Sequence, residues 1–567
     1  MEKRWVIKEA ADATTVAQLA LELGIDNVLA QLLVQRGISS FEEAKSFFRP
    51  SLDNLHDPFL MKDMDAAVSR IKKALEKKEK ILIYGDYDVD GTTAVALVFS
   101  FLKLHTELID YYIPDRYTEG YGISFAGIDY AKQHHFSLII ALDCGIKSND
   151  KIDYANELGI DFIICDHHRP GSELPKAIAV LDPKREDCQY PFDELSGCGI
   201  GFKLIQAFAA RKKIPFNQLE PLLEFVVISI AADIVPIHGE NRILSYYGLL
   251  QINKLPSPGI KAILELNKVK RELTISDLVF IIGPRINAAG RIENGKKAVE
   301  LLVSDNVTSA NISSRSINIT NTERKSLDTL ITQQALTLIN ENTELQKAKT
   351  TVLFQSDWHK GVVGIVASRL IEKFYRPTIV LTESNGKATG SARSVKGFDV
   401  YNAIEACADL LEQFGGHMYA AGLTLKLENL DAFRKKFEAV VASTIHESML
   451  VPEIEIDALI GFNQINPKFF RVLKQFAPFG PGNHAPVFMT KNIMDKGSIR
   501  IVGINHLKMD LQDPQNERVS FPAIAFGLAE HFDPILNRKP FSVCYAIEEN
   551  EYNGTVSMQL NVKDIRF

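Results

Sequence analysis

Short apolar runs alternate with amphipathic stretches from about residue 81 onward. The runs are ILIY (81–84), IDYYI (109–113), LIIAL (138–142), DFIIC (161–165) and IAVL (178–181). Apolar residues at helical spacing fill 92–104, 124–134 and 150–158. Continuous apolar runs separated by helices are typical of buried parallel strands in an α/β sheet. The pattern therefore predicts an α/β lobe in this part of the chain.

The rest of the chain changes character twice. Residues 300–348 carry no strand signal and place Leu327, Leu330 and Ile331 at helical spacing, which predicts a long connecting helix. A second α/β lobe follows, from TVLF (351–354) to a helix near 430–445. After Pro452, short strand-like runs lie between turn residues at close spacing, which is typical of a small β-barrel.

A chain of 567 residues is too long for a single hydrophobic core, and these changes predict how it divides. The residues before the first lobe have helical character and are expected to form a cap. The predicted boundaries are 1–78 for the N-terminal helical cap, 79–299 for the first lobe, 300–348 for the connecting helix, 349–449 for the second lobe and 450–567 for the barrel.

The composition, 46% hydrophobic and 24% charged, is that of an ordinary globular protein. The first residues, MEKRWVIKEAAD, lack the apolar core of a secretory signal. The longest apolar stretch, 222–237, contains Glu224, Asp233 and Pro236 and is too short to span a bilayer. We therefore expect a cytoplasmic protein without a membrane segment. Its 6 cysteines form no close CxxC pair, which argues against a disulfide framework and a thiolate zinc site.

The net charge of −7 does not favour a nucleic-acid-binding protein, but a polyanion responds to local potential. Residues 358–397 contain 7 basic and 2 acidic side chains, so this stretch carries 7 − 2 = +5. A solvated helix face explains part of this excess. Lys387, Arg393 and Lys396 lie instead in a segment rich in glycine and serine, where the backbone can approach a phosphate.

Acidic and histidine side chains follow three of the predicted strands. Asp86, Asp88 and Asp90 come after the first strand, Asp143 after the third, and Asp166-His167-His168 after the fourth. Ligands of open α/β sheets bind at the carboxyl ends of the strands, so these groups can converge. Asp233 follows an apolar helix and is a further candidate.

Each of these signals is weak alone, since an acidic turn is commonly solvated and an Asp at a helix end is commonly a cap. An EF-hand loop is excluded because Leu97 stands at its twelfth position. Taken together, clustered carboxylates with one or two histidines favour Mn²⁺ or Mg²⁺ over zinc. Two such ions can activate a water and stabilise the leaving oxygen of a phosphoryl displacement.

The motifs DYDVDG, DCG, DHH and ADIVP, in this order, resemble the DHH phosphoesterase superfamily. Further on, the chain resembles the bacterial RecJ exonucleases. The segments that carry this second resemblance are GPRINAAGR (283–291), GSARS (390–394), GGHMYAAG (415–422) and FGPGNHAPVF (479–488). The similarity extends from about residue 80 to the C-terminus, with no departure at a metal-ligand position.

The resemblance implies a metal-dependent enzyme that degrades single-stranded DNA from the 5′ end to mononucleotides, in DNA repair and recombination. It implies a DHH lobe, a DHHA1-like lobe that binds phosphate and DNA, and an OB-fold that binds single strands. Single-stranded DNA is then the principal partner. A single-strand-binding protein and a helicase are candidate protein partners, and the protein is expected to be a monomer.

The resemblance also assigns roles to residues. The metal ligands would be Asp88, Asp90, Asp143, His167 and Asp233, with Asp86 in the same motif and His168 as a catalytic histidine that either supports a metal ligand or contacts the phosphate. Arg116 would hold the terminal 5′ phosphate. The nucleotide backbone would be held by Arg285, Arg291, Ser391, Arg393 and His417.

Two alternatives to a DNA exonuclease stay open. A pyrophosphatase, an oligoribonuclease or a cyclic-dinucleotide phosphodiesterase would share the metal site, but such enzymes are generally shorter. A non-catalytic replication scaffold is the second alternative, and the intact set of converging acids argues against it.

Overall fold

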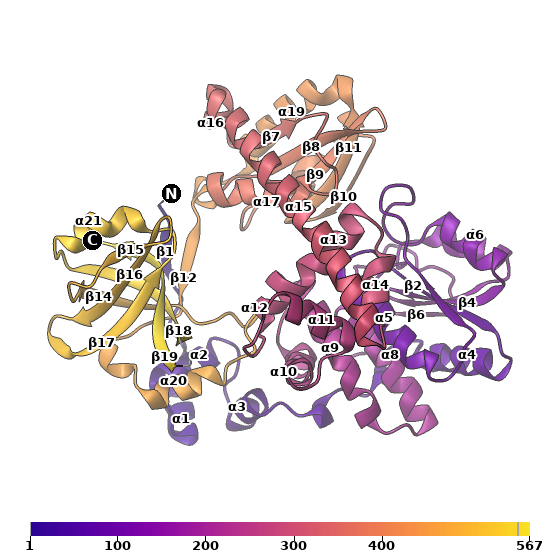
Figure 1. Ribbon diagram of the computed structural model, residues 1–567, viewed down its shortest axis with the longest axis horizontal. Helices are drawn as coiled ribbons and strands as arrows, with labels where there is room; N and C mark the ends of the chain where they lie inside the picture. The colour runs from indigo at the N-terminus through magenta and orange to yellow at the C-terminus, as the bar shows by residue number, and fades with distance from the viewer. Residues whose placement is uncertain (1, 553–554) are drawn as a thin grey trace. The chain divides into compact units, whose positions relative to one another are not determined.

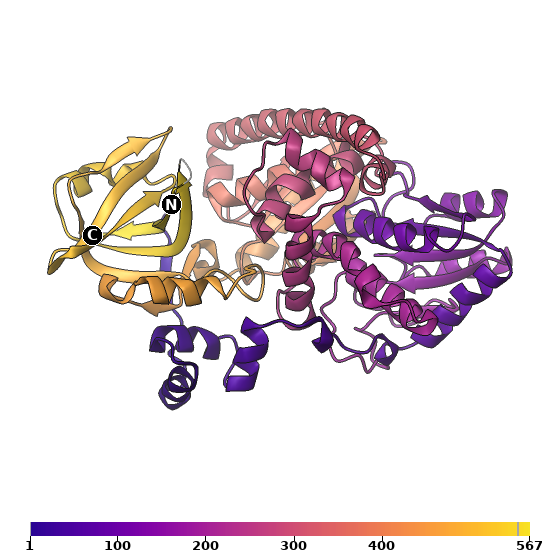
Figure 2. The same cartoon turned by 60° about the horizontal axis from the view of Figure 1, so that its bottom comes forward.

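The computed structural model describes residues 2–552 and 555–567, which form two compact units (Figure 1). The first unit comprises 49–325 and 478–484, and the second comprises 1–48, 326–477 and 485–567. The boundary at 325/326 falls within α15, Val307–Glu341, a single long helix in the region where a connecting helix is expected (Figure 2).

The first unit is built on a five-stranded, all-parallel sheet of order β3-β2-β4-β5-β6. Its strands are β2 (Lys80–Gly85), β3 (Ile109–Tyr112), β4 (Phe136–Leu142), β5 (Asp161–Cys165) and β6 (Ala179–Leu181). Each lies within about two residues of its predicted run. The sheet prediction is therefore confirmed, as is the parallel arrangement.

Helices cover both faces of this sheet, which explains why its strands are apolar without alternation. Alternate residues of β2 enter different cores: Ile81 and Ile83 pack with one set of helices, and Leu82 and Tyr84 with the other. The first set includes α4 (Met64–Glu76), α5 (Val89–Lys103), α8 (Gly197–Lys212) and α9 (Leu223–Ala232). The second set is α6 (Phe125–Gln133) and α7 (Asn149–Glu157).

The remainder of the first unit is helical. Its helices are α10 (Gly239–Lys254), α11 (Pro258–Leu266), α12 (Ile275–Asp277), α13 (Gly283–Ile292) and α14 (Lys296–Leu302). Pro258 occupies the first turn of α11, where its missing N–H is harmless. The buried apolar residues of α11, α13 and α14 join the core that contains α5 and α9, so these helices extend the lobe and form no separate core.

The second unit contains the second α/β lobe, whose sheet has the order β10-β11-β9-β8-β7. The strands are β7 (Thr351–Phe354), β8 (Thr378–Ser384), β9 (Lys387–Arg393), β10 (Gln413–His417) and β11 (Ala420–Lys426). Only the β7–β8 pair is parallel. The helices of this lobe are α16 (Thr343–Lys347), α17 (Val363–Phe374), α18 (Val400–Glu405) and α19 (Leu430–Thr444).

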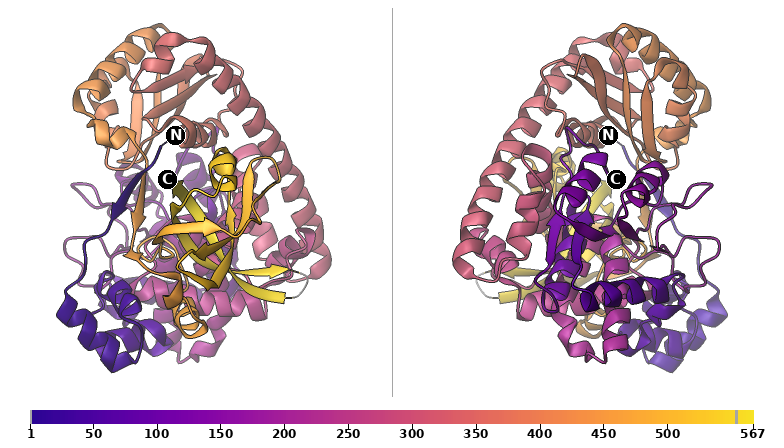
Figure 3. Two further views of the ribbon diagram at one scale, coloured as in Figure 1. Left: turned by 90° about the vertical axis from the view of Figure 1, so that its left-hand side faces the viewer. Right: turned by 90° about the vertical axis from the view of Figure 1, so that its right-hand side faces the viewer.

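Five C-terminal strands close into a barrel, seen as the yellow strands of Figure 3. Their pairing runs β14-β16-β17-β19-β18 and returns to β14, with β17 and β19 parallel. The strands are β14 (Phe488–Asp495), β16 (His506–Asp513), β17 (Asn516–Ala525), β18 (Phe541–Tyr552) and β19 (Thr555–Arg566), and β13 (Ala458–Leu459) and β15 (Arg500–Val502) extend the sheet. This five-stranded closed sheet confirms the predicted OB-like barrel.

The N-terminal region differs from the expected cap over 1–78. It begins with a strand, β1 (Arg4–Ile7), which pairs in parallel with β12 (Glu453–Ile456). Residues 1–48, including α1 (Ala13–Leu23), α2 (Asn27–Val34) and α3 (Phe41–Phe48), group with the second unit, and residues 49–78 group with the first. Local pattern missed β1 because its partner strand lies 449 residues further along the chain.

Two short helices complete the second unit: α20 (Pro467–Lys474) before the barrel and α21 (Phe532–Leu536) within it. Among the described residues, no single helix has the length and apolar character needed to cross a bilayer, although the bent pair α1 and α2 passes that test on length and composition.

Candidate metal centre

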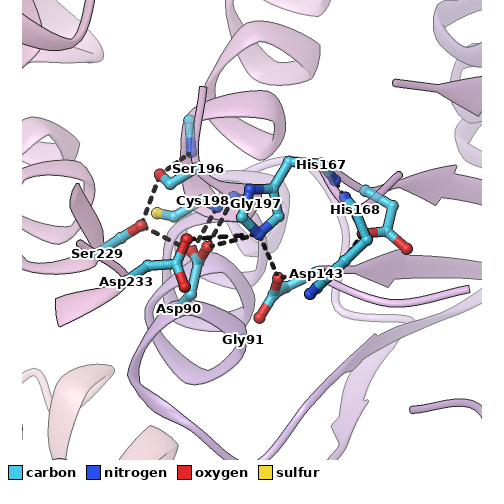
Figure 4. A network of polar contacts seen from close by, with 12 residues as sticks. Asp90, Gly91, Asp143, His167, His168, Ser196, Gly197, Cys198, Ser229 and Asp233 are labelled. Atoms are coloured by element: carbon cyan, nitrogen blue, oxygen red, sulfur yellow. Dashed lines mark hydrogen bonds and ion pairs between the residues drawn. The ribbon is translucent and has the colours of Figure 1, made fainter. Parts of the chain in front are cut away.

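Acidic side chains gather at the carboxyl edge of the parallel sheet, as its topology predicts. Asp86 follows β2, Asp143 follows β4 and Asp166 follows β5, while Asp90 lies in the first turn of α5. Asp233 caps the C-terminal end of α9. Figure 4 shows Asp90, Asp143 and Asp233 grouped around His167.

The Nε2 atom of His167 lies at the centre of this cluster. It is 3.2 Å from Asp143 Oδ1, 3.5 Å from Asp233 Oδ2 and 3.8 Å from Asp90 Oδ2. Two overlapping groups have ligand atoms within 4.8 Å of one another: Asp143 with His167 and His168, and Asp90 with His167 and Asp233. The two groups overlap at His167, whose Nε2 has one lone pair and can therefore bind a single ion.

Asp143 and the residue after Asp233 have backbone conformations that non-glycine residues rarely adopt. The φ angle is 59° at Asp143 and 63° at Ile234. An aspartate tolerates this left-handed region, but a β-branched isoleucine there is a true outlier. Such conformations persist only where their surroundings fix them, and they concentrate at functional sites. The strain therefore falls at or directly beside two of the expected ligands.

Asp90 is held in place by three hydrogen-bond donors. The backbone N–H groups of Gly197 and Cys198, at the N-terminus of α8, donate to its two oxygens at 2.7 Å each. The hydroxyl of Ser229 on α9 donates to Oδ1, also at 2.7 Å. Gly197 must be glycine because a Cβ would lie 2.6 Å from Cβ of Asp143. A helix N-terminus is well suited to fix a carboxylate as an anion.

Asp166 is the first residue of the DHH segment and is not among the side chains that converge on His167. It accepts hydrogen bonds from Ile146 N (2.9 Å), His167 N (2.8 Å) and His168 N (3.1 Å), and its Oδ1 lies 2.7 Å from His168 Nδ1. Burial opposes ionisation of Asp166, but the hydrogen bond with His168 and the backbone donors lower its pKa to about 2. Asp166 therefore orients the two histidines that follow it.

Several buried atoms of the cluster have no hydrogen-bond partner among the described residues. They are Asp86 Oδ2, Asp143 Oδ1 and both ring nitrogens of His167. Burial, together with the charges of Asp90 and Asp88, raises the pKa of Asp143 and of Asp233 well above the usual range. Burial lowers the pKa of His167 to about 4, so its ring is neutral at pH 7. A neutral imidazole facing three carboxylates is the arrangement that bound cations would complete.

Asp86 and Asp88 differ in placement although they share a motif. Asp86 is buried and accepts a long hydrogen bond from Gly122 N at 3.4 Å. Burial and the neighbouring charge of Asp88 raise the pKa of Asp86 well above its usual range. Asp88 is half-buried and caps α5 by accepting from Gly91 N at 3.0 Å. The structure places both beside the cluster, Asp86 deeper than Asp88.

Two arginines, Arg116 and Arg291, lie next to the Asp86–Asp90 loop. The guanidinium of Arg116 stacks over the ring of Tyr87, 5.0 Å from its centroid. The hydroxyl of Tyr117 donates to the carbonyl of Arg291. Gly290, within GPRINAAGR, contacts Tyr87 so closely that a Cβ would collide with its carbonyl oxygen. The end of that motif is thus packed on the Asp86–Asp90 loop, and Arg116 and Arg291 both lie close enough to Tyr117 to lower its pKa.

Arg285 is placed differently from the other expected phosphate contacts. It is buried in α13, where its guanidinium donates to Ile281 O at 2.5 Å, to Asn318 Oδ1 at 3.2 Å and to Asn267. These contacts engage all of its nitrogens in the packing of α13.

The other three residues expected to bind the nucleotide backbone, Ser391, Arg393 and His417, come together in the second unit. Ser391 and Arg393 lie on β9, and His417 lies at the end of β10. Strand β11 lies between these two strands, and its Ala420 pairs with both Arg393 and His417. Arg393 Nη1 donates to Ser391 Oγ at 2.6 Å. The GSARS and GGHMYAAG segments thus form one polar surface on neighbouring strands.

Sequence reasoning missed the residues that support the cluster. These are Ser196, Gly197, Cys198, Ser229 and Tyr121. Tyr121 places its hydroxyl 3.3 Å from His168 Nε2, and the hydroxyl of Ser196 lies 2.6 Å from Ser229 Oγ, which it can bond while Ser229 donates to Asp90. The run SGCGIG was a usable signal, because a serine followed by glycines marks a helix start that can approach an anion closely.

Comparison with known proteins matches three family models to this chain. The DHH family N-terminal domain matches residues 80–230, the DHHA1 domain matches 347–443, and the RecJ OB domain matches 456–564. Together they cover both α/β lobes and the barrel.

Full-length relatives match the same regions and the ends of the chain. The single-stranded-DNA-specific exonuclease RecJ of Bacillus subtilis is 36% identical over 566 residues, covering 99% of this chain and 70% of that protein. The protein of the same name from Salmonella typhimurium is 32% identical over 588 residues, covering 100% and 99%.

A solved structure agrees at the level of the fold. RecJ from Thermus thermophilus, in complex with Mn²⁺, has a TM-score of 0.84 and 26% identity, covering 100% of this chain and 79% of that one. With the geometry of the carboxylate cluster, these similarities show that the chain belongs to the RecJ family of single-stranded-DNA-specific exonucleases.

Proposed function

We propose that this protein is a metal-dependent exonuclease that hydrolyses single-stranded DNA from its 5′ end to mononucleotides. The observation that carries the proposal is the cluster around His167, where Asp143 Oδ1 and His167 Nε2 are buried without a hydrogen-bond partner among the described residues. Such atoms are costly to bury unless a ligand satisfies them. The membership of the RecJ family supplies the substrate class.

Two Mn²⁺ or Mg²⁺ ions fit the available donors, which are carboxylate oxygens and one neutral imidazole. One position would use Asp90, His167 and Asp233, and the other would use Asp143, with Asp86 and Asp88 beside it. Bound ions would supply an activated water and neutralise the leaving oxygen. The protein's part is to hold these ligands apart at fixed distances, through the donors to Asp90 and the strained backbone of Asp143.

His168 has a different part from His167. Its side chain is 46% exposed and is oriented by Asp166 on one ring nitrogen and by Tyr121 on the other. A histidine held in this way can donate a hydrogen bond to a phosphate oxygen of the substrate. We propose that His168 donates a hydrogen bond to the scissile phosphate.

The polarity of the enzyme would come from Arg116. Its planar fork of donors, stacked on Tyr87, suits bidentate recognition of a terminal phosphate. Arg291 lies close to it and would hold the adjacent backbone, and Ser391, Arg393 and His417 form a second phosphate-binding surface. A 5′ phosphate bound at Arg116 would place the first phosphodiester bond near the carboxylate cluster.

The barrel would bind the single strand and supply affinity. The proposed protein partners of the enzyme are a single-strand-binding protein and a helicase. The enzyme itself is proposed to be a cytoplasmic monomer.

Strands labelled at either end test the proposal. Purified protein with Mn²⁺ is expected to release labelled mononucleotides from the 5′ end of single-stranded DNA first, and to leave blunt duplex DNA intact. RNA of the same sequence and a cyclic dinucleotide serve as competing substrates. Preferred release from the 3′ end, or faster hydrolysis of RNA or the cyclic dinucleotide, would overturn it.

A further inference from the structure

The segment Pro478–His484 belongs to the first unit although the residues on both sides of it belong to the second. It connects α20 to β14 along the chain and contains most of the FGPGNHAPVF motif, which none of the expected roles explains. We call Pro478–His484 the strap. Its closest contacts within the first unit include the residues that follow Asp233.

The strap and the loop after Asp233 are joined by a backbone hydrogen bond and by close packing. Ile237 N donates to Pro481 O at 2.6 Å, and Ile237 is fully buried. Gly480 lies against the Ile237 side chain so closely that a Cβ would collide with its Cδ1 atom. A Cβ on Gly482 would lie 3.2 Å from Pro236 Cβ. Both glycines are therefore needed for the backbone to approach the loop.

The strap is rigid by its own hydrogen bonds. Gly480 and Asn483 exchange two backbone hydrogen bonds of 3.0 Å each. The side chain of Asn483, only 2% exposed, donates to Pro478 O at 2.9 Å. Gly482 has a φ of 72°, which completes the tight turn. A strap with this internal bonding can act as a fixed support for whatever packs on it.

What packs on it is a loop under strain. Ile234, directly after Asp233, has a positive φ and a side chain that is 69% exposed, so its own contacts do little to hold it. Two anchors hold the loop further along. Asn241 Nδ2 donates to Pro236 O at 3.0 Å, and Pro481 O accepts from the next residue, Ile237. Without such anchors, relaxation of Ile234 would turn Asp233 away from His167.

We propose that the strap is a positioning element for the metal centre, which holds the loop 234–238 so that Asp233 Oδ2 stays within ligand distance of the site shared with His167. This inference rests on the proposed metal-dependent function. Gly480 and Asn483 act on Asp233 through Ile237 and Pro478, so they are positioning residues. The C-terminal part of the chain thus contributes to the metal centre through seven residues, 478–484.

The variant Gly480→Ala tests the proposal, with Mn²⁺ binding measured by isothermal titration calorimetry on the full-length protein. We expect the Mn²⁺ dissociation constant to rise about tenfold or more, as when other supports of a metal ligand are removed. The kcat on single-stranded DNA should fall at limiting Mn²⁺, while KM for the DNA changes less than about twofold, since Gly480 packs on Ile237 and is not among the residues proposed to bind DNA.

A compensating change separates positioning from general destabilisation. Ile237→Val removes the Cδ1 atom that the new Cβ would meet, so the double variant Gly480→Ala/Ile237→Val should recover most of the Mn²⁺ affinity. Asn466→Ala is the matched control, because Asn466 caps α20 and does not belong to the strap. It should lower the midpoint of thermal unfolding and leave Mn²⁺ affinity unchanged.

Wild-type Mn²⁺ affinity in Gly480→Ala would overturn the inference, as would a loss of affinity that Ile237→Val fails to restore in a folded double variant. A wild-type protein that binds Mn²⁺ but does not hydrolyse DNA would instead refute the proposed function and leave the calorimetric test of the strap valid.

Discussion

At the scale of single residues, Asp90 and Asp143 show how one residue type is given two roles. Three donors, from Gly197, Cys198 and Ser229, occupy both oxygens of Asp90. Asp143 Oδ1 has no partner among the described residues. A carboxylate already fixed by three hydrogen bonds has little room beyond one metal contact, whereas an open oxygen can be shared between two ions.

The hydroxyl of Ser229 is expected to matter for metal affinity. Ser229→Ala removes one of the three donors to Asp90 and leaves the two N–H groups of α8 in place. Mn²⁺ binding measured by calorimetry should weaken about tenfold. Ser443→Ala, which alters an exposed hydroxyl on α19, is the control and should have no effect. Equal Mn²⁺ affinity in both variants would show that Ser229 has no part in positioning Asp90.

Arg116 is expected to determine the use of 5′ ends. Arg116→Ala should slow the hydrolysis of 5′-phosphorylated single strands by about tenfold or more, since a charge-assisted bidentate contact is lost. Strands with a 5′ hydroxyl should be affected much less. Arg434→Ala on α19 is the control. If both substrates slow equally, Arg116 is a structural residue of its loop.

The sequence pattern could bring the expected ligands to one edge of the sheet, but it could not reveal the residues that support them. Asp86, Asp143 and Asp166 could be placed together because the carboxyl ends of parallel strands share an edge. The contacts of Ser229 and Gly197 depend on how α8 and α9 pack against α5, which no local pattern records.

At the scale of elements, helix α9 carries Ser229, which supports Asp90, and ends at the proposed metal ligand Asp233. It is buried along almost its whole length and presents Ser229 and Asp233 one turn apart. Its first turn buries Glu224, which accepts a hydrogen bond from Ser257 N at 3.0 Å. Burial raises the pKa of Glu224 to about 7, so this carboxyl affects folding differently from the metal ligands.

Glu224 is expected to make stability depend on pH. Its folded pKa lies above the ordinary value of 4.5, so the folded protein holds an extra proton between about pH 4.5 and 7, and stability falls as pH rises through this window. Glu224→Gln keeps the acceptor and cannot ionise. It should stabilise the protein by on the order of 1–3 kcal/mol at about pH 8 and much less at about pH 5.

Thermal unfolding of Glu224→Gln and the wild type at both pH values measures this difference. An identical shift at the two pH values would show that Glu224 stays ionised in the folded protein. The same measurement on Glu42→Gln, at an exposed position in α3, controls for the removal of one surface charge.

Most strands and helices were predictable from local pattern, and the exceptions share one cause. The runs that became β2 to β6 are long, apolar and flanked by helices. Strand β1 is short, and it exists because Arg4 to Ile7 pair with Glu453 to Ile456. A strand that depends on so distant a partner gives almost no signal in its own sequence.

At the scale of the whole molecule, the barrel is the part whose outer surface suits single-stranded DNA. The side chains of Arg500 and Lys508 are direct cross-strand neighbours on β15 and β16. One step along, the rings of His506 and Phe526 are 5.2 Å apart, and Phe526 is 58% exposed. Cations beside exposed rings provide both backbone contacts and stacking for unpaired bases.

Phe526→Ala is therefore expected to weaken the binding of single-stranded DNA. Loss of one stacked base is worth on the order of 1–3 kcal/mol, so the dissociation constant should rise about fivefold or more at fixed salt. Fluorescence anisotropy with a labelled oligonucleotide measures it, with Phe567→Ala, another exposed ring of the barrel, as the control. Unchanged affinity in Phe526→Ala would exclude stacking at this position.

A point variant is a cleaner test of the barrel than a truncation at Pro452. Such a truncation would also remove β12, the partner of β1, and the strap that contacts the loop after Asp233. The barrel itself could be predicted from its short, closely spaced runs. Its closure through the β14–β16 pair, and the membership of the strap in the first unit, arise from contacts that the sequence pattern does not contain.

The most direct test of the account is the release of mononucleotides from 5′-phosphorylated single-stranded DNA by the wild type and by Asp143→Ala, at saturating Mn²⁺. We predict rapid release by the wild type, none in the presence of a chelator, recovery when Mn²⁺ or Mg²⁺ is restored, and almost none by Asp143→Ala at any metal concentration. Near-normal turnover by a folded Asp143→Ala, or by the wild type in chelator, would contradict the two-metal site at the centre of this account.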